Sequence, residues 1–133
     1  MMRTGFEGLS QKELDILEFA KGYDERVEKI ILGNILVSST LEKDVTQDVI
    51  SVLKAEDFYI ESHRKIYQAI LNTYKESNEV NIVLVKRKLE DIGEIDLVGG
   101  LEYLSNLVEL GTTDRDIKRY VEYMKNRNVE EST

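Results

Sequence analysis

The sequence has no proline among its 133 residues, which favours continuous helices over an architecture of strands and tight turns. It has no cysteine either, so disulfides and thiolate metal sites are excluded. This composition agrees with a reducing compartment, and we expect a cytoplasmic protein. Long apolar runs and the basic region of a signal peptide are also missing, so we predict no membrane segment and no secretory leader.

Histidine occurs only once, as His63, so a metal site with several His ligands or a Cys-His pair cannot be built. We expect His63 to be a partly exposed residue in the first turn of a helix. The neighbouring acids Glu56 and Asp57 are predicted to cap the helix that follows. Neither G-x-x-x-x-G-K-[ST] nor G-x-G-x-x-G occurs. We therefore expect no enzymatic activity, catalytic residue, metal or cofactor in this chain.

Positive charge is scarce, with 18 Lys and Arg against 26 Asp and Glu, a net charge of −8. A domain that binds a phosphate backbone by itself needs a clustered basic face. Residues 1–111 carry the whole excess of acidic residues, whereas residues 112–133 are balanced. Direct nucleic-acid binding by this chain is therefore disfavoured.

The apolar residues recur at helical spacing and predict an all-α fold, a compact bundle of about six helices. The length suffices for one domain with a single core. A shorter helix is predicted before the bundle, at residues 11–20, with a mobile arm as the alternative. The bundle helices are predicted at residues 24–37, 45–53, 61–76, 82–92, 101–110, and from a cap at Thr113 or Asp114 to about residue 126.

Local signals place the ends of these helices. Ser10 begins a capping box, and Gly22 and Asp24 are predicted to end the first helix and cap the second. Asn81 is predicted to cap the helix at 82–92, and Gly93 to end it. Residues 111–113 are predicted to break the chain. Residues that we expect to face the core in three of the helices are Val45, Val49, Val52, Leu53, Ile82, Val85, Leu89, Ile92, Leu101, Leu104, Leu107 and Val108.

Two further positions concern packing. Gly33 lies inside a predicted helix, where glycine costs about 1 kcal/mol relative to alanine. A close approach of a second helix explains it better than a hinge. Phe58 and Tyr59 are expected to anchor the junction before the helix at 61–76, because aromatic side chains bury large areas.

Five blocks, in order, resemble the N-terminal domain of bacterial replicative DNA helicases of the DnaB family. The central one is D-F-Y-I-E-S-H-R-K-I-Y-Q-A-I at residues 57–70. The others are E-K-I-I-L-G-N-I-L at 28–36, V-N-I-V-L-V at 80–85, L-V-G-G-L-E-Y-L at 97–104 and I-K-R-Y-V-E-Y-M-K at 117–125. The resemblance covers about residues 24–127.

The resemblance implies two parts, an N-terminal extension at residues 1–23 and a collar domain at residues 24–133. It implies that the chain ends within the first helix of a helical hairpin and lacks the RecA-like ATPase domain, which would bind ATP and Mg. It also implies that these domains pair within a hexameric collar. The implied partners are the chain itself, the C-terminal domain of primase and a helicase loader.

The stripe Ile117, Tyr120, Val121 and Met124 is the candidate protein interface. We expect the hairpin or a neighbouring subunit to cover it, or the stripe to pack on its own bundle. On the first hypothesis, Tyr120→Asp weakens self-association without unfolding the domain. The competing functions are a stand-alone or primase-type module that binds a helicase, and a small enzyme or nucleic-acid binder.

Overall fold

The computed structural model describes residues 8, 10–38 and 44–132, and within them it contains helices and no strand. Residues 1–7 and 9 of the predicted extension lie outside the described residues. The predicted all-α bundle of about six helices is confirmed. The elements are α1 Gln11–Ser38, α2 Thr46–Ile50, the 3₁₀ helix η1 Ala55–Asp57, α3 Glu61–Ser77, α4 Ile82–Asp91, α5 Gly100–Thr113 and α6 Ile117–Ser132.

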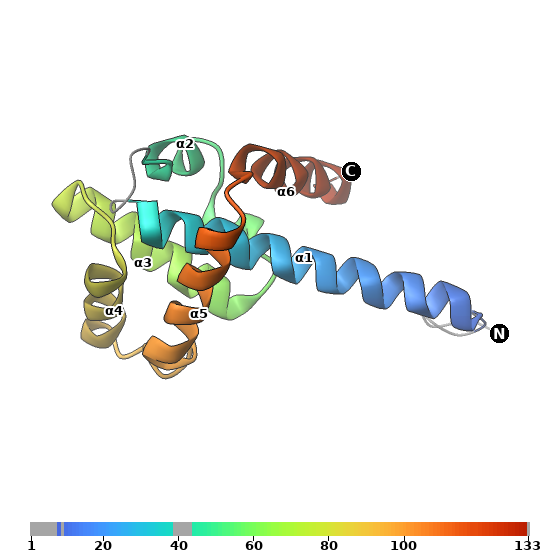
Figure 1. Ribbon diagram of the computed structural model, residues 1–133, viewed down its shortest axis with the longest axis horizontal. Helices are drawn as coiled ribbons and strands as arrows, with labels where there is room; N and C mark the ends of the chain where they lie inside the picture. Colours follow the sequence, from blue (N-terminus) through green and yellow to red (C-terminus); the bar gives the residue numbers. More distant parts are fainter. Residues whose placement is uncertain (1–7, 9, 39–43, 133) are drawn as a thin grey trace.

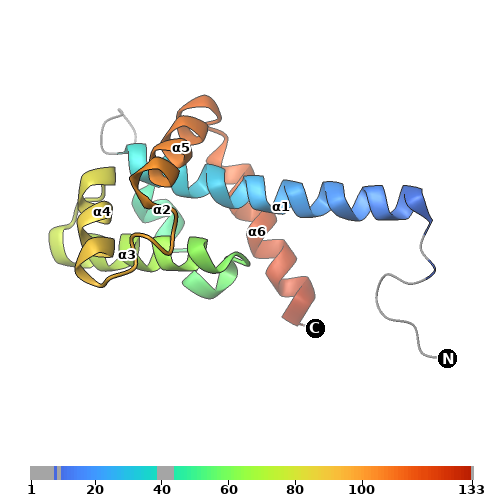
Figure 2. The ribbon, with the colours of Figure 1, turned by 90° about the horizontal axis from the view of Figure 1, so that it is seen from below.

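Helix α1 forms the axis of the molecule. Its C-terminal half is buried continuously from Ile30 to Leu36, because the other helices gather around that half (Figure 1). Its N-terminal half projects from the bundle, as both ribbon views show (Figure 2). The core therefore lies at one end of a helix of 28 residues.

The prediction of two separate helices before residue 38 is wrong, because α1 runs unbroken through Gly22 and Asp24. Nothing packs against Gly22, so the helix bears only the intrinsic cost of glycine there. Asp24 does not cap a helix; its carboxylate accepts a hydrogen bond from Tyr123 of α6. The start is as predicted, since Ser10 Oγ accepts the N–H of Glu13 at 3.2 Å.

Helices α1 and α5 cross at two glycines. A Cβ at Gly33 would lie 1.8 Å from the carbonyl oxygen of Leu107, and one at Gly111 would lie 2.2 Å from the carbonyl carbon of Gly33. The prediction of close helix approach at Gly33 is confirmed. The predicted break at residues 111–113 is wrong, because α5 continues to Thr113. Gly111 is required by the crossing and does not end the helix.

Three side chains predicted to face the core are exposed. Val52 lies in the turn after the short α2, Ile92 follows the end of α4, and Leu101 is in the first turn of α5. Each lies at or beyond the end of its helix, where a neighbouring helix no longer covers the face. The other predicted core positions are buried or half-buried. The last helix also passes residue 126 and continues to Ser132.

The junction before α3 is anchored as predicted. Phe58 is fully buried and packs on Tyr67, with ring centroids 4.7 Å apart. Tyr67 donates a hydrogen bond to the carbonyl oxygen of Leu53 at 2.8 Å. The prediction that Asp57 caps the helix that follows is wrong. Asp57 Oδ2 accepts the N–H of Lys54, at the start of η1, and so closes the turn that precedes the junction.

The cap and end of α4 are also as predicted. Asn81 Oδ1 accepts the N–H of Leu84 at 2.9 Å, which satisfies a backbone donor in the first turn. Gly93 follows the helix with a φ of +73°, a conformation that glycine adopts without steric cost. Both signals are local in the sequence, and both hold in the folded chain.

Candidate protein-interaction site

The four predicted interface residues of α6 divide between two environments. Tyr120 and Met124 are 5% and 0% exposed and pack into the core. Ile117 and Val121 are half-buried and line a groove between α6 and α2. The predicted stripe is therefore half core and half surface, and only its outer half can contact another molecule directly.

The groove has a volume of about 530 Å³ and an apolar floor with charged groups around it. Because most of the apolar residues are valines, the floor is shaped by short side chains and has room for larger ones. A concave apolar surface of this kind is suited to the apolar face of a helix. Its apolar residues are Val45, Val49, Val52, Ile117 and Val121, and its charged residues are Asp48, Lys118, Glu122 and Lys125.

Tyr120 fastens the start of α6. Its hydroxyl donates to Asp114 Oδ2 and accepts from Arg119. The hydrogen bond from Tyr120 lowers the pKa of Asp114, and the same bond raises the pKa of Tyr120. A Tyr120→Asp change would place a second carboxylate beside Asp114 in a buried position. That variant is therefore unsuitable for testing self-association, contrary to the sequence-based hypothesis.

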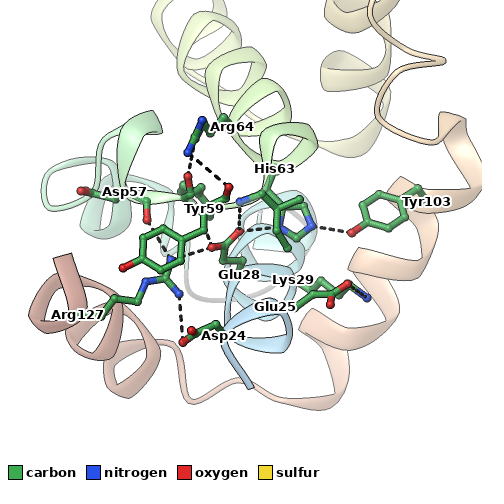
Figure 3. A network of polar contacts seen from close by, with 12 residues as sticks. Asp24, Glu25, Glu28, Lys29, Asp57, Tyr59, His63, Arg64, Tyr103 and Arg127 are labelled. Carbon is green, nitrogen blue, oxygen red and sulfur yellow. Dashed lines mark hydrogen bonds and ion pairs between the residues drawn. The ribbon is translucent and has the colours of Figure 1, made fainter. Parts of the chain in front are cut away.

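Behind the groove, a buried carboxylate organises the other side of α6 (Figure 3). Glu28 Oε1 accepts from His63 Nδ1 at 2.8 Å and from the N–H of Ile60 at 3.3 Å. Its Oε2 accepts from the N–H of Tyr59 at 2.8 Å and from Arg127 at 2.7 Å. Glu28 is fully buried, and four donors satisfy its charge. We call Glu28, His63, Tyr103 and Arg127 the Glu28 network.

His63 is fully buried in this network, so the prediction of a partly exposed histidine is wrong. The ionised Glu28 only accepts, which assigns the proton to Nδ1 of His63. The Tyr103 hydroxyl lies 2.6 Å from Nε2 of the same ring. Burial raises the pKa of Tyr103 to about 12, so its hydroxyl keeps the proton that it can donate. The Glu-His-Tyr chain thus joins α1, α3 and α5.

Arg127 fixes the far part of α6. One nitrogen donates to Glu28 and to the carbonyl oxygen of Asp57 at 3.0 Å, and another lies 3.4 Å from Asp24. The guanidinium carbon lies 3.6 Å from the ring centroid of Tyr59, a cation–π contact. These contacts hold α6 against α1 and the segment before α3. The α6 wall of the groove is therefore held from behind by buried charge.

The buried Glu28 carboxylate is expected to make the stability of the fold depend on pH. Burial opposes its ionisation, but the bonds from His63, Tyr59 and Arg127 outweigh burial and lower its pKa below the ordinary 4.5. In the unfolded chain Glu28 takes up its proton near pH 4.5, before the folded carboxylate does. We expect the unfolding free energy to fall as pH drops through and below 4.5. When urea unfolding is measured from pH 7 to 3, the unfolding free energy of Glu28→Gln should fall less steeply with pH than that of the wild type. Equal slopes would contradict the lowered pKa of Glu28.

The sequence analysis missed Glu28, Tyr103 and Arg127. Glu28 and Tyr103 lie within the blocks that carry the family resemblance, and Arg127 follows the last block. The available signal was Glu28 itself, one acid directly beside the most apolar part of α1. A buried carboxylate needs a partner of opposite charge, so this acid pointed to a buried ion pair.

Among the described residues, no three His, Cys, Asp or Glu side chains gather as metal ligands. Within the same residues no helix has the length and apolarity that a membrane crossing needs.

Comparison with known proteins gives one consistent result. The family model for the DnaB-like helicase N-terminal domain matches residues 20–126. The replicative DNA helicase DnaB of Leifsonia xyli subsp. xyli is 35% identical over 107 residues, which are 80% of this chain and 22% of that protein. A probable replicative DNA helicase of Trieres chinensis is 30% identical over 105 residues, 79% of this chain and 22% of that protein. This chain spans about a fifth of the length of these curated relatives.

A solved structure agrees with the sequence matches. The crystal structure of the N-terminal domain of DnaB helicase from Mycobacterium tuberculosis matches with a TM-score of 0.67 at 28% identity. The match covers 76% of this chain and 67% of the other. The fold and the sequence therefore point to the same family.

Proposed function

The chain belongs to the family of DnaB-like helicase N-terminal domains, and we propose that it is the non-catalytic, self-associating part of a replicative helicase. In this proposal the domains pair within a hexameric collar in the cytoplasm during DNA replication. The collar receives the C-terminal domain of primase and serves a helicase loader. ATP and Mg belong to an ATPase domain outside this chain.

The observation that supports self-association most directly is the groove between α2 and α6. Its floor is apolar, and Ile117 and Val121 on its α6 wall are only half-buried. An apolar surface with a charged rim is typical of a protein-binding site. The net charge of −8 supports a protein partner over a nucleic acid. The Glu28 network and Tyr120 keep the α6 wall rigid, which lowers the entropic cost of binding.

Val121→Asp tests the self-association part of this proposal. An unpaired charge in the groove should weaken association of the chain by about tenfold or more, because the carboxylate must lose water when the groove is covered. Sedimentation equilibrium over a wide concentration range measures this. Val83 is an exposed valine on α4, so Val83→Asp makes the same chemical change elsewhere and should have no effect. A wild-type chain that stays monomeric at high concentration would contradict the proposal.

Primase binding needs its own measurement. We expect the C-terminal domain of a primase from the same source to bind the wild-type chain in isothermal titration calorimetry. If the chain associates with itself but does not bind the primase domain, the primase part of the proposal is wrong and the part on the collar stands.

A further inference from the structure

The N-terminal part of α1 is an unsupported helix with large apolar side chains. Residues 11–22, which we call the arm, extend over about 18 Å at 1.5 Å per residue. They leave the bundle in both ribbon views (Figures 1 and 2). Phe19 is 76% exposed, Ile16 57% and Leu17 42%. The arm therefore presents apolar surface that no other described part of the chain covers.

This surface continues the face of α1 that packs in the core. Ile16, Phe19 and Tyr23 are spaced i, i+3 and i+7, and the buried Val27 and Ile30 follow at i+11 and i+14. Tyr23 is already partly covered, since its ring contacts Tyr123 of α6 edge to face at 5.0 Å. The apolar face of α1 thus extends beyond the core of its own chain. Such a face is suited to packing against an apolar surface of another molecule.

Because the groove between α2 and α6 is a concave apolar surface, we propose that the arm of one copy docks in this groove of a second copy. In this arrangement Ile16 and Phe19 enter the valine-lined floor. The inference rests on the proposed self-association and names the two surfaces that meet. It goes beyond the family match, which begins at residue 20 and so leaves out most of the arm.

The arm cannot fill the groove of its own chain. Helix α1 is continuous from Gln11 to Ser38 and is fixed in the core from Val27 onward. Its N-terminal half points away from the bundle and has no break at which it could fold back. A docked arm must therefore come from another molecule.

Side-chain size supports this pairing. The groove floor consists mainly of valines, which leave space above them, whereas the arm presents an isoleucine and a phenylalanine. An amphipathic helix that lays its apolar face into such a groove is a recurring mode of recognition, with anchors at i and i+3. Val52, which is 39% exposed on the α2 side, would be covered by the docked arm.

Charge complements the contact on one side of the groove. Glu13 and Asp15 flank the apolar stripe of the arm on either side. The groove has Lys118 and Lys125 on its α6 wall, seven residues apart and so on one side of the helix.

The groove also contains two acids, Asp48 on the α2 side and Glu122 on α6. Because the arm has an acid on each flank, an arm with one acid toward Lys118 and Lys125 has the other on the side of Asp48. The charge complementarity is therefore confined to the lysines of α6.

Disulfide trapping tests the contact between the arm and the groove. Because the sequence has no cysteine, only the introduced cysteines can form a cross-link. One chain carries Phe19→Cys and a second carries Val52→Cys. Mixed and oxidised, they should form a cross-linked heterodimer within minutes. Phe19→Cys mixed with Val83→Cys is the control, since Val83 is exposed on α4 and lies outside the groove, and this pair should cross-link at least about tenfold more slowly. Dominant cross-linking between two Phe19→Cys chains would overturn the proposal in favour of paired arms.

Sedimentation equilibrium separates this inference from the proposed function. Phe19→Asp and Val52→Asp should each weaken self-association about tenfold, because each buries a charge in the contact. Leu97→Asp and Val83→Asp change exposed apolar residues elsewhere and should not. If the wild-type chain associates but neither Phe19→Asp nor Val52→Asp weakens it, the arm contact is overturned and self-association stands. If the wild-type chain is monomeric throughout, both are overturned.

Discussion

The Glu28→Gln variant is expected to lose about 3–5 kcal/mol of unfolding free energy, the cost of breaking a buried ion pair by removing one partner. The substitution keeps the shape of the side chain but removes the charge that Arg127 and His63 face. The amide can accept at only one of its two terminal atoms, so at least one of the four donors loses its acceptor. Urea unfolding at pH 7, followed by circular dichroism, measures the loss.

Glu25 supplies the matched control for this prediction. It lies one turn before Glu28 on the same helix, but it is exposed and pairs with Lys29 at 3.4 Å on the surface. Surface pairs of this kind contribute about 0–1 kcal/mol. Glu25→Gln should therefore change the unfolding free energy by well under a third of the Glu28→Gln effect. Equal losses in the two variants would show that the Glu28 network is not a main source of stability.

The Glu28→Gln variant should also loosen α6, because Arg127 ties the far part of this helix to Glu28 on α1. Amide hydrogen exchange of α6 should become faster in Glu28→Gln than in Glu25→Gln. If α6 moves, the α6 wall of the groove moves with it. The network therefore connects a buried charge to the surface that is proposed to bind a second copy.

The parts of the fold that depend on nearby residues could be predicted from the sequence. The apolar spacing of α3 and the Asn81 cap of α4 are local signals, and the structure has both as expected. Gly33 was also interpretable, because glycine inside a strongly apolar helix has few explanations other than a close neighbour. These predictions needed no knowledge of which helix packs against which.

The wrong predictions of helix ends arise where a residue is needed for a tertiary contact but is also of a type that often ends or caps a helix. Gly22 and Asp24 form a plausible helix end and cap, yet Asp24 is held by α6, about a hundred residues later in the chain. Gly111 resembles a helix terminator, but it is small because Gly33 lies against it. In each case the packing of a distant helix overrides the local preference.

The candidate site was predictable only in part, for the same reason. The sequence predicted four residues of α6 as an interface, but it could not divide them between core and groove, because the position of α2 decides that. The Glu28 network joins residues 35 to 99 positions apart. Periodicity does not report such pairs, and one histidine in a helix gives no sign of its burial.

The crossing of α1 and α5 predicts the second large effect. Gly33→Ala should lower the unfolding free energy by about 3 kcal/mol or more, beyond the usual cost of overpacking, because the obstacle is rigid backbone. The added methyl would meet the Leu107 carbonyl oxygen at 1.8 Å and the Gly111 nitrogen at 2.9 Å. The helices can relieve this only by moving apart along the contact between them. Gly111→Ala should have a similar effect, since it meets the backbone of Gly33 and Asn34 at 2.2 to 2.6 Å.

Gly22→Ala is expected to change the unfolding free energy in the opposite direction from Gly33→Ala. The comparison therefore separates the effect of the backbone clash from the helix propensity of glycine. Gly22 lies in the same helix as Gly33, but a Cβ there would meet nothing within 4 Å. Alanine should stabilise the chain by up to about 1 kcal/mol, since it removes the helix cost of glycine without adding a clash. The same substitution in one helix is thus expected to raise stability at position 22 and lower it at position 33. Urea unfolding of the three variants measures this, and a Gly33→Ala chain as stable as the wild type would mean that α1 and α5 do not approach as closely as described.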